Sequence, residues 1–297
     1  MRVALIVVLS LAISGCALWR KDEAEPVENT GPRKEKAEPV LKPSEAMKPK
    51  SLEIASPVSD HFYMRGIYFQ PSVTTQLRLD PSPTTQGTLL SGEDDLGLDD
   101  VINQGRMEFD IRMLERHHVR MDYFKLNRFS EGALPRDIVF GDFTFQEGDN
   151  FRAKLDWRVL TLTYTYQFFK FERFEAGFGL GIHIIEAQAE GSEPGTLNSE
   201  KASEVGIFPT LAANAAFRIS KRWAVTARGQ TFSATPEGFD GTMSDYHMDI
   251  QYRWRKNLAI GLGYTMLESD LQVVDTDQPL LFNMETSGPE IFFRVSF

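Results

Sequence analysis

The chain has 297 residues, a formal net charge of -10 and a single cysteine. The acidic balance argues against a nucleic-acid-binding role, and one cysteine excludes an intramolecular disulfide. After the first 15 residues no apolar run approaches the length of about 18 residues that a spanning helix needs, so a membrane-embedded domain would have to be a closed β-barrel.

The N-terminus, MRVALIVVLSLAISG over residues 1–15, has one basic residue followed by an apolar run of signal-peptide length. This run closes on Ile13-Ser14-Gly15-Cys16, which resembles the bacterial lipobox. The resemblance implies that Cys16 becomes the first mature residue and carries lipid. An ordinary secretory signal with an incidental cysteine is the alternative, and in both cases the chain leaves the cytoplasm.

Residues 16–58 are dominated by Lys, Glu and Pro and show no apolar periodicity. Such a segment cannot bury enough apolar surface to offset its ordering entropy, so we expect a disordered periplasmic linker. The remaining residues, 59–297, are long enough for one sizeable domain.

Alternation of apolar and polar residues begins with an expected strand at 62–79. A hairpin follows, in which 106–114 turns through a short basic segment into 119–129. The segment 136–145 also has strand character, but it falls inside a long link, and we interpret it as a β extension above the membrane.

The rest of the chain repeats this unit, with short basic turns joining strands that carry one apolar and one polar or small face. The expected strands are 160–169 with 174–184, 207–219 with 223–232, 243–254 with 258–266, and the terminal strand 287–297.

Longer links, rich in Gly, Ser, Pro and acidic residues, separate these pairs. They are expected at about 80–104, 130–150, 188–203, 233–242 and 269–286. Short turns at one rim and long loops at the other are typical of outer-membrane barrels. The pattern predicts an all-β transmembrane antiparallel up-and-down barrel over residues 59–297 with ten strands; eight and twelve are the alternatives.

The last strand, EIFFRVSF, ends the chain on Phe297. It resembles the C-terminal signature of bacterial outer-membrane proteins, and the hairpins resemble the small barrels of the OmpA-like and OmpW-like class. The resemblance implies that Phe297 is read by the outer-membrane assembly machinery. It also implies the outer membrane of a Gram-negative bacterium as location, with membrane lipid and lipopolysaccharide as partners. A soluble barrel, with apolar residues inside, is the alternative.

In a membrane barrel the polar faces point into the lumen, where buried charges need partners. The mixed signs predict an ion-pair network that largely closes a narrow interior. The residues assigned to this network are Glu108, Asp110, Arg112, Arg120, Asp122, Arg228, Asp245, His247, Asp249, Arg253, Glu290 and Arg294.

Asp245, His247 and Asp249 share one inward face, and omptin-type proteases use an Asp–His pair at the outer rim. Such a row suits a histidine acting as general base, but we interpret it as a structural ion-pair element. Ser244 points to the opposite face from His247, which excludes a Ser–His pair, and His117 and His118 are expected to be solvated turn residues.

The sequence therefore predicts a non-enzymatic barrel with a structural or surface-interaction role and with no cofactor or metal. A narrow channel or transporter for small or amphipathic solutes is the first alternative. A hydrolase at the outer rim is the second.

Overall fold

The computed structural model describes residues 57–195, 199–234, 239–274 and 276–297, so the predicted signal peptide, Cys16 and most of the predicted linker lie outside it. In this part of the chain no helix is long and apolar enough to cross a membrane. The strands are β1 (Phe62–Phe69), β2 (Ser72–Leu79), β3 (Leu90–Ser91), β4 (Gln104–Met113), β5 (His117–Ala133), β6 (Ile138–Phe140), β7 (Phe143–Phe145), β8 (Asn150–Lys170), β9 (Phe174–Ser192), β10 (Ser199–Arg218), β11 (Trp223–Ala234), β12 (Phe239–Arg255), β13 (Leu258–Val273) and β14 (Leu280–Ser296).

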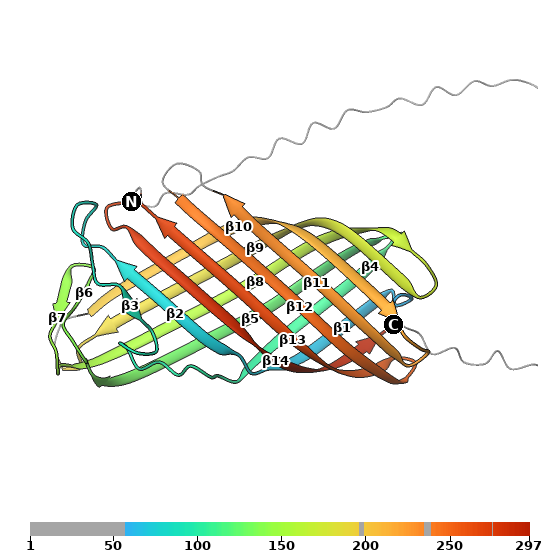
Figure 1. Cartoon of the computed structure of the whole chain (residues 1–297), viewed down its shortest axis with the longest axis horizontal. Coiled ribbons are helices and arrows are strands. Elements are labelled where there is room, and N and C mark those ends of the chain that lie inside the picture. The colour runs from blue at the N-terminus through green and yellow to red at the C-terminus, as the bar shows by residue number, and fades with distance from the viewer. Residues whose placement is uncertain (1–56, 196–198, 235–238, 275) are drawn as a thin grey trace, which may run out of the picture. The chain divides into compact units, whose positions relative to one another are not determined.

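Twelve of these strands form one antiparallel sheet, in which β2 and β3 are an extension and the other ten close into a barrel (Figure 1). Closure is made by β1 and β14, which pair from Tyr63 with Ser296 to Phe69 with Glu290. The carbonyl of Phe297 accepts hydrogen bonds of 3.1 Å from the backbone of His61 and of Phe62. The predicted fold and the count of ten barrel strands are confirmed.

The expected opening strand 62–79 is interrupted at Gln70 and Pro71, between β1 and β2. Proline cannot donate to a strand ladder, and this favours a break there. Both pieces keep one register along β14, because Ser72 pairs with Ser287 just as Phe69 pairs with Glu290. On its other side β1 pairs with β4, whereas the other side of β2 pairs only with the short strand β3, which is not part of the barrel.

The loop between β2 and β4, residues 80–103, closes the wall beside β2. Its backbone joins β2 at Val73, whose N–H donates to Asp100 at 2.7 Å. Its attachment to β5 uses side chains: Arg128 lies 2.6 Å from Glu93, and the Ser130 hydroxyl donates to the carbonyl of Leu96. Arg128 also donates to Thr75 of β2 at 2.8 Å, so one guanidinium holds both edges of this seam.

Partway along each long strand the outer face of the barrel wall changes from apolar to charged, and the inner face changes from polar to apolar. On β8 the outward residues from Leu160 to Phe168 are apolar or aromatic, while Arg152, Lys154, Asp156 and Arg158 point outward nearer the long loops. We call the part that ends at the short turns the lower barrel (160–170 on β8) and the part toward the long loops the upper barrel (150–159 on β8).

Strand pairing aligns this exchange across neighbouring strands. Tyr123, Leu160 and Ile184 form the top apolar row of the outer surface on β5, β8 and β9. The next row up is charged, with Lys125 beside Arg158 and Arg158 beside Glu186. From Leu160 to Phe168 the strand rises about 27 Å at about 3.4 Å per residue. At a tilt of about 40° this covers about 21 Å, close to the apolar band of about 25 Å in membrane barrels.

The upper barrel shows that three of the predicted links are mostly strand. The expected links 188–203, 233–242 and 269–286 are wrong in extent, because β9 to β14 run well into them, whereas the link 130–150 agrees closely with the end of β5 at Ala133 and the start of β8 at Asn150. Their polar residues face outward and their apolar residues face inward, the reverse of the pattern used to find membrane strands. The segment 136–145 does form a separate hairpin, β6–β7, which turns at Gly141 with a φ of 58°.

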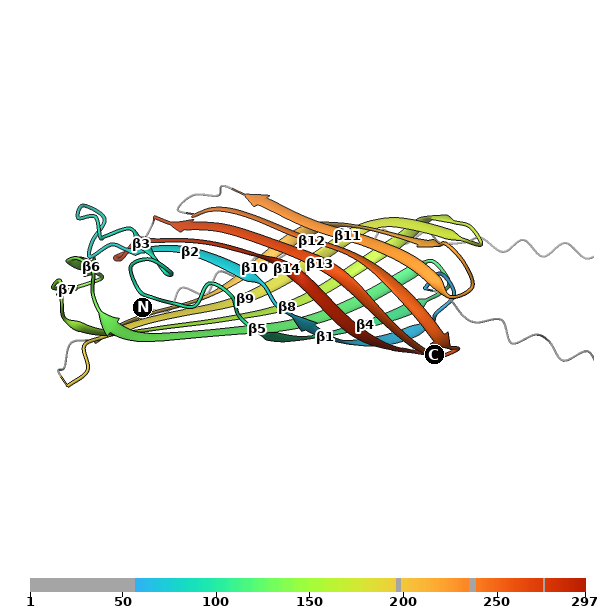
Figure 2. The same cartoon turned by 60° about the horizontal axis from the view of Figure 1, so that its bottom comes forward.

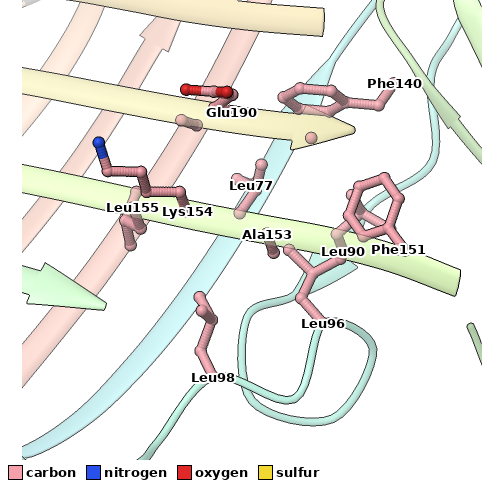
Figure 3. Close-up of a pocket in the computed structure, with 12 residues that line it drawn as sticks. Leu77, Leu90, Leu96, Leu98, Phe140, Phe151, Ala153, Lys154, Leu155 and Glu190 are labelled. Atoms are coloured by element: carbon pink, nitrogen blue, oxygen red, sulfur yellow. The ribbon is translucent and has the colours of Figure 1, made fainter. Parts of the chain in front are cut away.

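Apolar side chains fill the upper barrel, toward which the loop leucines Leu96 and Leu98 also converge (Figure 3). Trp157 is fully buried and stacks on Phe282 with ring centroids 4.9 Å apart. The β6–β7 hairpin adds buried Ile138 and lies at the same end of the barrel as β3 in both views (Figures 1 and 2). This core resembles that of a soluble barrel and places a dry layer above the polar interior.

Candidate functional site: the charged interior of the lower barrel

The structure brings the predicted network residues together inside the lower barrel. Eleven of the twelve are buried residues. The twelfth, Arg228, is half-buried as a whole residue, but its side chain is only 8% exposed. They meet because their strands alternate: each stands between outward-facing neighbours such as Tyr246, Met248 and Ile250 on β12. Arg120 of β5 stands directly opposite Asp110 of β4.

Arg65 of β1 lies at the centre of this network. Its guanidinium is 2.9 Å from Asp249, 3.6 Å from Glu108 and 3.7 Å from Glu290, and the ring of Phe292 lies 3.6 Å from it. Because Glu108 and Glu290 come from the neighbouring strands β4 and β14, and Asp249 comes from β12 farther around the barrel, one side chain links β1 to both neighbours and to a strand that it does not pair with. Glu108 is also paired with Arg228 of β11 at 2.6 Å.

A second group of contacts lies just below the apolar layer. Arg106 of β4 pairs with Asp122 at 2.8 Å and reaches Asp245 at 3.7 Å. Its guanidinium is also 2.9 Å from Nε2 of His247, whose Nδ1 lies 2.7 Å from the Thr265 hydroxyl. Thr265 in turn donates to Glu290 at 2.8 Å, which joins this group to the Arg65 cluster.

The mouth of the barrel at the short turns is filled by the residues that precede β1. Asp60 is 5% exposed and pairs with Arg253 of β12 at 2.5 Å and with Arg294 of β14 at 2.7 Å. Arg112 of β4 donates to the carbonyls of Pro57 and Val58 at 3.2 and 2.8 Å, and it pairs with Glu175 at 2.9 Å. We call residues 57–60 the base plug.

Sequence reasoning missed several members of this network. Arg65 and Arg106 alternate with apolar or small neighbours on short stretches of β1 and β4, so the period-two pattern could have found them. Asp60 precedes the first strand, where no periodic signal applies. The expectation that His118 is a solvated turn residue is wrong, because it is buried in β5 with Nδ1 2.9 Å from Asp110.

The row of Asp245, His247 and Asp249 does not form an open reaction site. His247 is 5% exposed, and its two ring nitrogens face Arg106 and Thr265. Asp245 lies 2.7 Å from His247, but Asp249 is paired with Arg65. β12 begins at Phe239, so the row lies well inside the barrel and not at its outer rim.

Two spaces among the inward-facing side chains are small. One of about 20 Å³ lies in the upper barrel among Leu77, Phe151 and Leu155 (Figure 3). One of about 10 Å³ lies where Phe124 meets His183 at the boundary of the two halves. Each has room for about one water molecule. Among the described residues no group of three or more acidic, His or Cys side chains is arranged to hold a metal ion.

No family model matches the sequence, and no curated protein matches it. Several solved barrels have a similar fold. The outer-membrane protease OmpT of Escherichia coli is 8% identical, with 79% of this chain and 97% of that chain covered and a TM-score of 0.45. The outer-membrane protein OprG of Pseudomonas aeruginosa is 10% identical, with 78% and 94% covered and a TM-score of 0.35.

The attachment invasion locus protein Ail of Yersinia pestis is 12% identical, with 76% of this chain and 98% of that chain covered and a TM-score of 0.29. Values this low indicate nothing about activity. The barrel is defined by its own strand pairing, which places this chain among closed ten-stranded antiparallel β-barrels.

Proposed function

We propose that this chain is a non-enzymatic outer-membrane barrel whose interior is closed and whose upper barrel stands at the cell surface. The observation that carries the proposal is that the interior is filled at three successive heights. The base plug occupies the mouth, the Arg65 network fills the lower barrel, and an apolar core fills the upper barrel.

Closure at each height has a different physical basis. A solute would have to separate Asp60 from two arginines, then break buried ion pairs at Arg65, then enter the dry layer around Trp157. Removing one partner of a buried ion pair costs about 3–5 kcal/mol, so spontaneous opening of the lower barrel is rare. This favours a structural or surface-presenting role over a narrow channel, the first alternative.

The upper barrel supports the surface role because it carries the outward charges Lys154, Arg158 and Glu186, and it ends in the β6–β7 hairpin. A protein needs no charged wall inside a bilayer, and this part therefore lies beyond the apolar band. Nothing in the buried Asp245–His247 contact favours hydrolysis, the second alternative.

Single-channel recording in planar bilayers tests the closed interior. The purified full-length protein, shown to be inserted by heat-dependent gel mobility, should produce no stable conductance steps. Reproducible steps from the same folded preparation would contradict the proposal. A deletion of residues 57–60, which keeps the expected signal peptide and linker, tests the base plug separately, and the network above it should keep this variant closed as well.

The surface role is tested with a membrane-impermeant maleimide on intact cells. Asp142 lies in the exposed turn of the β6–β7 hairpin, and Lys256 lies in the exposed turn before β13, at the opposite end of the barrel. Asp142→Cys should be labelled in intact cells, whereas Lys256→Cys should be labelled only after the outer membrane is permeabilised. The reverse pattern would place the upper barrel in the periplasm.

A further inference from the structure

The outer surface of the lower barrel has a groove over β1 and β4. Its volume is about 630 Å³, in the range of ligand pockets, which is about 300–1,000 Å³. Two glycines, Gly66 and Gly105, form its floor. Apolar and aromatic side chains form its walls, and they include Tyr68, Met107, Tyr123, Ile260, Ile291 and Phe293.

The groove exists because glycine replaces a large residue at two outward positions. Gly66 lies between Met107 of β4 and Phe293 of β14, and Gly105 lies beside Tyr68. A Cβ atom added at either glycine would meet no atom within 4 Å, and neither glycine has a positive φ. The backbone therefore does not require glycine here, and the two positions stand out as a hollow in an otherwise bulky surface.

The groove reaches the top of the apolar band. Tyr68 lies opposite Ile291, and the next outward residues on β14 toward the loops are Pro289 and Ser287. Polar groups take over immediately above: the Tyr68 hydroxyl donates to Asn103 at 2.5 Å, and Gln70 donates to Asn103 at 3.2 Å. The end of the groove nearer the short turns is therefore apolar, and the end at Tyr68 lies where lipid headgroups begin.

Two cations lie at this height on the adjoining strands. Lys125 is the next outward residue above Tyr123, and it stands directly opposite Arg158. Arg158 is paired with Glu186 at 3.0 Å, whereas Lys125 forms no hydrogen bond or ion pair within the described residues. Like charges directly across a strand pair are destabilising, and an anion between them relieves the repulsion.

We propose that this groove binds one acyl chain of a phosphorylated lipid of the outer leaflet, with a phosphate of that lipid against Lys125 and Arg158. The lipid surroundings of the lower barrel make hydrocarbon the material that contacts Gly66 and Gly105. The leaflet assignment rests on the orientation given under Proposed function, while the site itself rests on the groove and the cations alone.

Native mass spectrometry of the detergent-purified barrel, incubated with lipid A or with diacylglycerol, which has acyl chains but no phosphate, tests the site without reference to orientation. Wild type should retain one lipid A and at least tenfold less diacylglycerol. Gly66→Leu and Gly105→Leu fill the groove and should each lower lipid A retention at least tenfold. Gly132→Leu is the matched control, because Gly132 also has open space at its Cβ but lies at the far end of β5.

Lys125→Gln should lower lipid A retention by about threefold to tenfold, and Lys201→Gln on β10 should leave it unchanged. Each variant is checked for heat-dependent gel mobility, so that loss of folding is separated from loss of binding. Equal retention of lipid A by wild type and both groove-filling variants would overturn the site. Equal retention of diacylglycerol and lipid A would overturn the phosphate contact. Conductance by the wild-type barrel would contradict the proposed function without affecting this result.

Discussion

The lower and upper barrel place their charged and apolar side chains on opposite faces of the wall. The lower barrel has charges inside and Leu162 or Tyr164 outside, while the upper barrel has Leu155 and Trp157 inside and Lys154 outside. Both halves belong to the same strands and keep the same period of two. Strand alternation therefore fixes which residues share a face, while the surrounding medium decides which face carries the apolar residues.

The stabilising forces differ accordingly. In the upper barrel, water is displaced from apolar surface, which stabilises by about 25 cal/mol per Å². In the lower barrel the outer side chains pass from water into the hydrocarbon of the bilayer, while the inner charges have to be paired, so closure depends on lipid contact, backbone hydrogen bonds and ion pairs together. Equivalent substitutions should therefore have different effects in the two halves.

The largest effect is expected from Arg65→Met. It leaves Glu108, Asp249 and Glu290 without their shared cation in a buried site. We expect a loss of about 3–5 kcal/mol in the free energy of unfolding, because uncompensated buried charge is costly. Urea unfolding in lipid vesicles measures it. Arg65→Lys keeps a cation and should lose less; equal losses in both variants would show that packing on Phe292 matters more than charge.

The next effect compares the introduction of an arginine at two positions on the outer wall, one in the lower barrel and one in the upper barrel. Leu162→Arg places a cation in the apolar band and should cost about 2–4 kcal/mol in lipid vesicles. Ser203→Arg, on the exposed outer wall of β10 in the upper barrel, should change stability by less than about 0.5 kcal/mol. Similar costs at the two positions would contradict the division of the wall into a lipid-facing and a solvent-facing part.

A smaller effect is expected at the seam beside β2. Arg128→Met removes the contacts to Thr75 and Glu93, which should destabilise the loop 80–103 by about 2 kcal/mol. Limited proteolysis should then cut this loop faster, while heat-dependent gel mobility stays unchanged. Arg152→Met is the control, since Arg152 is an exposed outer residue of β8. Unfolding of the whole barrel would show that the seam is not a local feature.

The smallest effect concerns pH in the same loop. A hydrogen bond from Arg136 lowers the pKa of Asp95, and the two side chains lie 2.7 Å apart. A lowered pKa means that the contact stabilises above the unfolded Asp value of about 3.9 and loses this contribution as pH falls through the lower folded value. Arg136 is 49% exposed, so the contribution is below about 1 kcal/mol. Proteolysis of wild type and Asp95→Asn should differ at pH 7, and the difference should disappear as pH falls through the lowered pKa of Asp95 in the folded protein.

The lower barrel could be predicted from sequence because its signal is redundant. Each strand repeats the alternation, and ion pairing follows once residues such as Glu108 and Asp249 are placed on one inner surface. The terminal pairing of β1 with β14 follows from closure alone. Specific partners, such as Asp60 with Arg253, could not be predicted. Asp60 lies in a segment before the first strand that has no apolar periodicity, so its partners depend on where the folded chain places that segment.

The upper barrel was missed although its alternation is equally regular. NFRAKLDWRV, residues 150–159, places Phe151, Leu155 and Trp157 on one face and charges on the other. The criterion for a membrane strand requires apolar residues on the outer face, which this segment lacks. Glycines and acidic residues nearby in the sequence also favoured a loop. The extension is found when each strand is searched for the point at which its apolar residues change from one face to the other. On β8 this point is Leu160.

The base plug also has a mechanical consequence. A pull on the chain ahead of residue 57 does not peel β1 away from its neighbours, because Asp60 passes the load to β12 and β14, and the backbone of Val58 passes it to β4. A force on this part of the chain is therefore shared among three strands of the barrel, and these ion pairs and hydrogen bonds have to break before β1 can leave its neighbours.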